Sequence, residues 1–164
     1  MRVIGIDPGT YNMGVGIVDS ESPDLSLVHV VVLRPKKSDP MSTRLFYLFQ
    51  ELGKLLSSFL PDSMAIEQPF VSRNVRSAMS IGQAQSVAMI AAASVEIEIT
   101  GYSPSQVKQS VTDYGASSKE QVQEMVRALL ELDYIPSPTD ATDALAVAIC
   151  HINSVESLNL TLNP

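Results

Sequence analysis

The sequence predicts a mixed α/β sandwich, in which a five-stranded sheet is flanked by helices. Short apolar runs end at breaker residues, as strands do, and they alternate with longer segments whose apolar residues recur at helical spacing. A three-stranded meander followed by a helix and a fourth strand is the order that returns a parallel strand beside the first one. The chain has 164 residues, 45% of them hydrophobic, so we expect one domain over residues 1–158 and a short tail over residues 159–164.

Three strands are predicted in the first 35 residues. The segment RVIGID, residues 2–7, is apolar up to its terminal aspartate and is followed by a DPGT turn. Residues 12–20 and 25–35 are two further β-rich runs, separated by the breaker cluster SESPD. Because the connections are short, the three strands are expected to form an antiparallel meander.

An amphipathic helix is predicted over residues 43–60, with Asp39 and Pro40 as its cap and first-turn proline. Seven apolar residues share one face of it. They are Leu45, Leu48, Phe49, Leu52, Leu55, Leu56 and Phe59. The helix leads to SMAIEQ, residues 63–68, a short strand that again ends on a carboxylate.

The second half of the chain predicts one more strand and three helices. Residues 74–96 form a long helix rich in Ala, Ser and Gly, and residues 97–103 form the fifth strand. The next helix, residues 117–132, begins with Ser117 and Glu120 in capping-box spacing. The last helix, residues 137–152, is nearly all apolar and is therefore expected to be buried.

Composition excludes several classes of protein. A single cysteine, Cys150, rules out an intramolecular disulfide, and His29 and His151 lack the partners of a zinc site, so both are expected to be structural. The longest apolar stretch has nine residues, too few to span a bilayer, and no basic-then-apolar leader is present. We therefore expect a cytoplasmic protein. The net charge of −7, taken alone, argues against nucleic acid as a partner.

Four acidic residues stand out by their positions. Asp7 ends the first strand and Glu67 ends the fourth, so both emerge at one edge of the sheet if these strands are parallel neighbours. Asp140 and Asp143 are three residues apart at the start of the last helix and share one face. Each acid also fits a structural role, because carboxylates cap turns and are favoured in the first turn of a helix.

Taken together, the four acids predict a metal site. Carboxylates gathered at one place do not all stay ionised without a cation or a shift in pKa. An all-oxygen set without His or Cys suits Mg²⁺ or Mn²⁺. Two such ions per site are the usual apparatus for in-line attack on a phosphodiester.

Six segments occur together in the order and spacing of one family. They are GIDPGT, AIEQPF, IGQAQ, SQVKQSV, SSKEQVQEMVRALL and TDATDALAVAICH. With them the chain resembles the RuvC family of Holliday junction resolvases from about residue 2 to residue 152. The resemblance implies an RNase H-like fold with sheet order 3-2-1-4-5 and a homodimer. It also implies Mg²⁺-dependent paired nicking of four-way DNA junctions in the bacterial cytoplasm, and the RuvAB branch-migration complex as a partner.

The resemblance also implies roles for individual residues. The four carboxylates Asp7, Glu67, Asp140 and Asp143 match catalytic, metal-binding positions. Lys108 and Lys119 match lysines near the scissile phosphate that also bind DNA. Further DNA contacts are implied for Phe70, which would meet an unstacked base, and for Arg73, Asn74 and Arg76. Gln85 stands where many relatives carry arginine, which removes one expected phosphate contact.

Three alternatives stay open at this point. One is another RNase H-like nuclease, such as the ribosomal-RNA-processing type, which shares the early aspartate. A second is an ATP-binding protein of the sugar-kinase and actin kind, whose phosphate loop resembles DxGT but which normally needs two such domains. The third is a junction-binding scaffold without catalysis, against which the four intact acids argue.

Overall fold

The computed structural model describes residues 1–68 and 75–162, and it confirms the predicted sheet. Its five strands are β1 (Arg2–Asp7), β2 (Met13–Glu21), β3 (Asp24–Leu33), β4 (Ser63–Glu67) and β5 (Glu98–Tyr102). Their spatial order is β3-β2-β1-β4-β5, with β1 to β3 antiparallel and β4 and β5 parallel to β1. The architecture is the expected RNase H-like mixed sheet.

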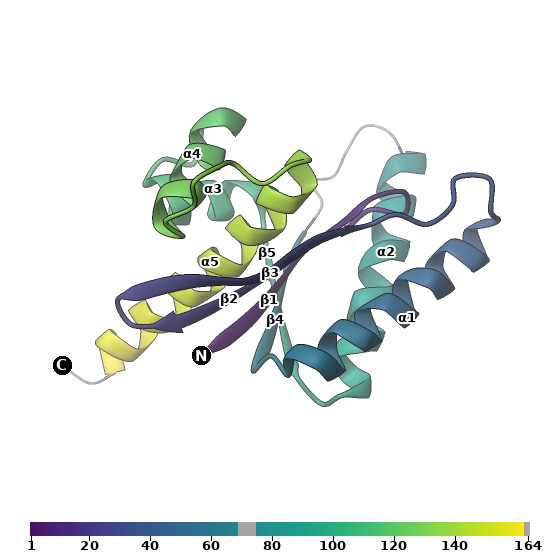
Figure 1. Cartoon of the computed structure of the whole chain (residues 1–164), viewed down its shortest axis with the longest axis horizontal. Helices are drawn as coiled ribbons and strands as arrows, with labels where there is room; N and C mark the ends of the chain where they lie inside the picture. Colours follow the sequence, from purple (N-terminus) through teal and green to yellow (C-terminus); the bar gives the residue numbers. More distant parts are fainter. Residues whose placement is uncertain (69–74, 163–164) are drawn as a thin grey trace.

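Within the described residues, five helices cover the two faces of this sheet (Figure 1). They are α1 (Met41–Phe59), α2 (Val75–Ser94), α3 (Pro104–Thr112), α4 (Lys119–Leu129) and α5 (Thr139–Leu162). Helices α1 and α2 pack on one face, where their buried residues share a core with Ile4, Ile6 and Met64. Helix α5, flanked by α3 and α4, packs on the other face in a second core with Val3, Val18 and Ala65.

Helix α1 buries the predicted apolar stripe but begins differently from the prediction. Leu48, Leu52 and Leu56 are buried against the sheet, as their four-residue spacing requires. The N-cap is Pro40, which offers no side-chain acceptor, so Asp39 does not cap this helix. The expected cap and first-turn proline are therefore wrong by one position.

The cap of α4 is also shifted by one residue from the prediction. The hydroxyl of Ser118 accepts from the backbone N–H of Gln121, and the Gln121 side chain accepts from the backbone N–H of Ser118. Ser117 is instead buried and donates its hydroxyl to the carbonyl of Tyr114. Because Ser117 and Ser118 are adjacent and each is followed three residues later by Glu or Gln, the sequence does not show which of them is the cap. The burial of Ser117 leaves Ser118 as the N-cap.

Glycines let α5 lie unusually close to the sheet. A Cβ at Gly14 would stand 2.0 Å from the carbonyl oxygen of Asp140, and one at Gly5 would stand 2.2 Å from that of Ala144. Only a strand without side chains at these points admits the helix backbone. Helix α5 then continues to Leu162, so most of the expected tail from residue 159 is helical.

The two histidines and the cysteine have structural surroundings. His151 is buried, with its ring nitrogens 2.9 Å from the Tyr102 hydroxyl and 3.0 Å from that of Ser63. His29 stacks on Phe59, and Cys150 is a buried free thiol. In the described part of the chain, no helix combines the length and the apolar character needed to cross a membrane.

Candidate active site

The first two carboxylates are brought together by strand pairing. β1 and β4 are parallel neighbours, with Ile6 opposite Ile66, so Asp7 and Glu67 both lie at the carboxyl-terminal edge of the sheet. Both strands are apolar up to the acid, which fixes their interior residues in the two cores and leaves the terminal side chain at the edge. The parallel register of β1 and β4 therefore places these two acids at one edge, as predicted.

The close approach of α5 brings the other two carboxylates to the same edge. Asp140 and Asp143 lie in the first turns of α5, and Gly14 of β2 receives the backbone of Asp140. Because β2 pairs with β1 through Gly14 and Asp7, this contact places the start of α5 beside Asp7. The four carboxylates come from three distant segments of the chain.

Burial and neighbouring charges shift the pKa values of three of these acids, Asp7, Glu67 and Asp143. Burial raises the pKa of Asp7 to about 7, and the charges of Glu67, Asp143 and Asp140 add to the rise. Burial and the charge of Asp143 also raise the pKa of Glu67. For Asp143 burial raises the pKa, and Lys119 opposes that rise. A divalent cation bound among these carboxylates would relieve this repulsion.

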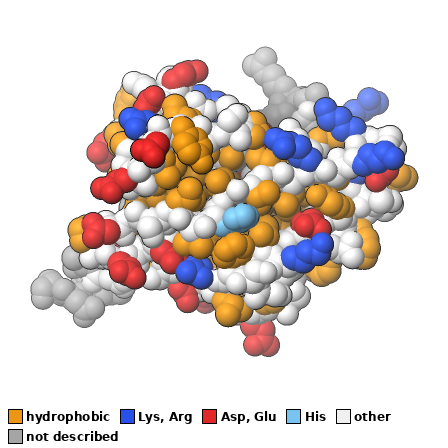
Figure 2. All heavy atoms as spheres, in the orientation of Figure 1, with side chains coloured by type: hydrophobic (Ala, Val, Ile, Leu, Met, Phe, Trp, Pro, Cys, Tyr) orange, Lys and Arg blue, Asp and Glu red, His pale blue; other side chains and the backbone are white. Residues whose placement is uncertain are grey.

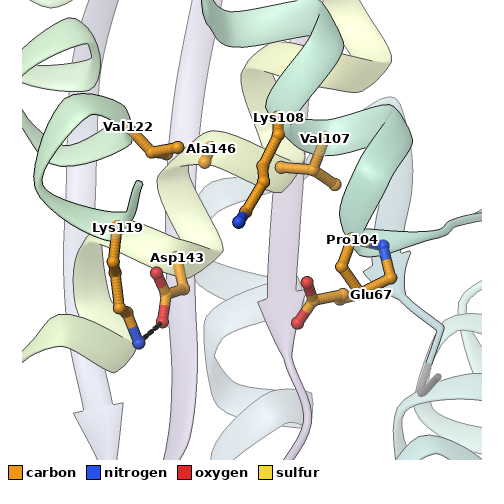
Figure 3. A pocket seen from close by; sticks show the side chains of 8 residues that line it. All are labelled: Glu67, Pro104, Val107, Lys108, Lys119, Val122, Asp143 and Ala146. Carbon is orange, nitrogen blue, oxygen red and sulfur yellow. Dashed lines mark ion pairs between the residues drawn. The ribbon is translucent and has the colours of Figure 1, made fainter. Parts of the chain in front are cut away.

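Two lysines enter the same site from the helices beside α5. The ammonium of Lys119, at the start of α4, lies 2.7 Å from an oxygen of Asp143 (Figure 3). Lys108 on α3 points into the same cavity, toward Glu67. The cavity has a volume of about 230 Å³ and is lined by Glu67, Asp143, both lysines and four less polar residues. A negatively charged group that enters it meets two ammonium groups.

The donor set fits a hard divalent cation in its chemistry. It consists of carboxylate oxygens, and burial raises the pKa of three of the groups, Asp7, Glu67 and Asp143. Within residues 1–68 and 75–162, however, no three acidic, His or Cys side chains lie close enough to hold one ion as they stand. Asp143 is instead paired with the ammonium of Lys119.

A polar contact from α2 holds the strand end that carries Glu67. The side-chain amide of Gln85 donates to the backbone carbonyl of Glu67 at 2.9 Å. The resemblance treats Gln85 as a lost phosphate contact. In the structure the side chain of Gln85 has a structural role, because its hydrogen bond connects α2 to the residue at the end of β4.

Of the remaining predicted DNA contacts, one lies within the described residues and three do not. Phe70, Arg73 and Asn74 lie outside the described residues. Arg76 is exposed in the first turn of α2 and lines a groove together with Asp140.

Three exposed basic residues at the carboxylate edge were missed from sequence. Arg34, Lys36 and Lys37 follow directly on β3. The end of β3 lies at the same edge as that of β1, because Leu33 pairs with Met13 and Gly14 pairs with Asp7. The signal was present in the sequence, because the basic cluster follows the third strand of the predicted antiparallel meander, whose end lies at the same edge as the end of the first strand.

Comparisons with known proteins show the family to which the chain belongs. Residues 3–151 match the family model described as crossover junction endodeoxyribonuclease RuvC. A protein of that name from Dehalococcoides mccartyi is 46% identical over 161 residues, 98% of each chain. One from Desulfitobacterium hafniense is 43% identical over 97% of this chain and 96% of its own.

Solved structures show the same fold. Thermus thermophilus RuvC, in a complex with Holliday junction substrate, superposes with a TM-score of 0.92 at 32% identity, with 96% of each chain covered. The yeast mitochondrial Holliday junction resolvase has a TM-score of 0.65 at 16% identity, covering 96% of this chain and 81% of its own, and is similar in fold.

Proposed function

The chain belongs to the RuvC family of crossover junction endodeoxyribonucleases, and from this premise we propose that Asp7, Glu67, Asp140 and Asp143 form the site at which it cuts four-way DNA junctions. Membership of the family makes the chain a Holliday junction resolvase, an enzyme of recombination and repair. The observation that carries the proposed site is the convergence of the four carboxylates at one sheet edge, where Asp7 has a pKa of about 7.

The family is one of metal-dependent nucleases, and we propose Mg²⁺, with Mn²⁺ as a substitute, at two ions per site. The four carboxylates would hold them. Bound ions of this kind neutralise phosphate charge and lower the pKa of a water that attacks phosphorus. The expected products carry a 5′ phosphate and a 3′ hydroxyl.

The two lysines have a distinct role in this proposal. Lys119 and Lys108 lie on the wall of the cavity beside Glu67 and Asp143, where a phosphate would sit. Their ammonium groups then stabilise the charge that develops on the phosphoryl oxygens during attack. For Lys119 this requires that the ammonium leaves Asp143 and turns to the phosphate, a change that a cation on Asp143 favours.

The proposed DNA surface extends from this site over basic residues at the same edge. Arg76 is exposed beside the carboxylates, and Phe70, Arg73 and Asn74 stay predicted contacts from the resemblance. Figure 2 shows that, on the face in view, Lys and Arg gather at the end where β3 leads to α1. Asp and Glu gather at the opposite end. This division explains how a chain of net charge −7 presents a basic surface to DNA.

We further propose that the chain works as a homodimer. A four-way junction has two-fold symmetry, and a two-fold pair of identical sites matches its two strands. Large apolar side chains are exposed along α2, among them Met79 at 64%, Met89 at 52% and Ile90 at 59%. A second copy would cover this surface. An Ile90→Glu variant is expected to sediment as a monomer, and an unchanged dimer would remove α2 from the interface.

Two expectations rest on the resemblance alone. The proposed partner, besides junction DNA, is the RuvAB branch-migration complex, and the proposed location is the bacterial cytoplasm. Co-sedimentation with junction-bound RuvAB would test the first, and absence of the chain from the cytosolic fraction would contradict the second.

The proposed activity is tested with a synthetic four-way junction. The chain is incubated with it, with and without Mg²⁺, beside Asp7→Asn and a matched control, Asp24→Asn, whose exposed carboxylate lies on the first residue of β3. We expect paired symmetric nicks that need both Mg²⁺ and Asp7 and that persist in the control. Equal cutting by Asp7→Asn would refute the proposed site. Preference for linear duplex or RNA would favour another RNase H-like nuclease.

A further inference from the structure

Helix α1 contains a buried arginine whose charge has no acidic partner among the described residues. Arg44 is only 6% exposed. One terminal nitrogen donates to the carbonyl of Thr10 at 3.3 Å, the other contacts the sulfur of Met41, and Nε has no hydrogen-bond partner. A buried guanidinium without a carboxylate is unfavourable, so the burial of Arg44 calls for a reason.

The ring of Tyr11 covers this guanidinium. Cζ of Arg44 lies 4.0 Å from the ring centroid, which is cation–π geometry. Tyr11 follows the DPGT turn and is nevertheless 48% exposed. Arg44 thus holds one face of an aromatic ring at the surface, four residues after Asp7, while much of the ring stays open to solvent.

This ring forms part of a groove beside the carboxylates. The groove has a volume of about 450 Å³ and is lined by residues 9–12, by Asp140 and by residues of α2. A hydrogen bond of 2.6 Å between the hydroxyls of Thr10 and Ser80 fixes its two walls to each other. Asp140 is one of the four proposed metal ligands, so the groove lies beside the proposed site.

The groove and the lysine cavity share no lining residue. The cavity lies beside Glu67 and Asp143, and the groove lies beside Asp140. A DNA strand whose scissile phosphate sits at the carboxylates has to continue on both sides of it. The lysine cavity offers two cations, and the groove offers the cation of Arg76, hydroxyls, an amide and an aromatic ring.

We propose that this groove receives a nucleotide next to the scissile phosphate, with its base stacked on Tyr11, and that Arg44 is the positioning residue that holds the ring. The inference rests on the proposed function. Stacking of a base on an aromatic side chain corresponds to about a 5- to 150-fold gain in affinity. It also gives the buried arginine a role, because Arg44 fixes the ring before DNA arrives.

The test uses a junction labelled with 2-aminopurine, whose fluorescence falls when it stacks. The nick is first mapped with Mg²⁺, and the label is then placed one or two nucleotides to either side. Ca²⁺ replaces Mg²⁺ during binding, and nicking under Mg²⁺ is measured in parallel.

We expect quenching of the 2-aminopurine fluorescence at one position with the wild type and with Tyr11→Phe. With Tyr11→Ala we expect no quenching and about a tenfold or greater loss of junction affinity. Quenching that persists in Tyr11→Ala, or is absent at every position in the wild type, overturns the proposal.

The positioning role of Arg44 is tested with Arg44 variants, alone and combined with Tyr11→Ala. Arg44→Met keeps the length of the side chain and removes the charge, and it is expected to reduce both quenching and affinity, whereas Arg44→Lys retains much of both. Added to Tyr11→Ala, Arg44→Met should cause no further loss. Leu60→Ala, at the far end of α1, is the surface control. A further loss of junction affinity in the double variant would show that Arg44 does not act through the ring.

The two proposals fail in different ways. A wild-type chain that nicks junctions without any 2-aminopurine quenching contradicts this inference alone. A wild-type chain that nicks no junction removes the proposed function, and the inference with it.

Discussion

Asp7 has the most strongly perturbed carboxyl among the four, since its pKa rises from 3.8 to about 7. Burial is the main cause, and the charges of Glu67, Asp143 and Asp140 add to it. A carboxyl in this state is partly protonated at neutral pH and loses its proton when a cation binds beside it. The residue is therefore destabilising in the metal-free chain and useful in the metal-bound one.

This perturbation predicts how stability depends on pH. The folded chain holds the Asp7 proton between about pH 4 and pH 7, whereas the unfolded chain has released it. The contribution of Asp7 to the free energy of unfolding is therefore present below about pH 4 and is lost as the pH rises to about 7. The rise in pKa corresponds to at most about 4 kcal/mol.

Asp7→Asn should remove that dependence. In thermal melts with EDTA we expect the variant to be more stable than the wild type at pH 8, by about 2 to 4 kcal/mol, and the difference to shrink toward pH 4. A variant that is less stable than the wild type at pH 8 would show that a partner stabilises the Asp7 carboxylate, and that burial and neighbouring charges do not destabilise it.

Lys119 is predicted to matter for the reaction and little for folding. Its side chain is 53% exposed, so its ion pair with Asp143 contributes no more than about 1 kcal/mol. We expect Lys119→Met to slow junction nicking by about 10²- to 10³-fold with little change in melting temperature. Lys54→Met, which breaks the ion pair with Glu51, is the matched control and should nick normally. Comparable nicking by the two variants would exclude a role at the phosphate.

At the scale of elements, the contact between β2 and α5 determines where half of the acids lie. A methyl group at Gly14 would overlap the carbonyl of Asp140. We expect Gly14→Ala to destabilise the chain by about 1 to 3 kcal/mol and to abolish nicking, because the start of α5 has to move away from Asp7. Gly53 is the control.

A methyl group at Gly53, inside α1, meets nothing within 4 Å. Gly53→Ala should therefore stabilise the chain by about 0.5 to 1 kcal/mol and keep its activity. Chemical denaturation and junction nicking, measured on both glycine variants, test the pair. If Gly14→Ala melts and nicks as the wild type does, the close approach of α5 is not required.

The helices and strands also show which features of the site could be predicted from the sequence alone. Apolar runs that end on Asp7 and Glu67 predicted the shared sheet edge, because period and length identify buried strands. The ion pair of Lys119 with Asp143 was beyond sequence reasoning, since it depends on how α4 packs beside α5. Arg44 precedes Leu48 at helical spacing and so lies on the buried stripe of α1, but no pattern in the sequence shows that Tyr11 covers it.

At the scale of the whole molecule, the charge distribution predicts how junction binding responds to salt. The chain is acidic, yet its exposed cations at the carboxylate edge include Arg34, Lys36 and Lys37. We expect weak binding that falls steeply with salt. Changing Lys36 and Lys37 to serine should reduce the slope of log affinity against log salt by about 2, if each lysine contacts one phosphate. Lys54→Ser should leave the slope unchanged, and an unchanged slope in the double variant would remove this segment from the DNA surface.

The central claim is that folding gathers carboxylates from distant segments into a site for divalent cations. Calorimetric titration of Mn²⁺ into the metal-free chain at pH 7 tests it most directly, beside Asp7→Asn and Asp24→Asn. We predict that the wild type and Asp24→Asn bind alike with release of protons, and that Asp7→Asn binds at least about tenfold more weakly. Equal affinity in all three proteins would place the ion elsewhere and contradict the account.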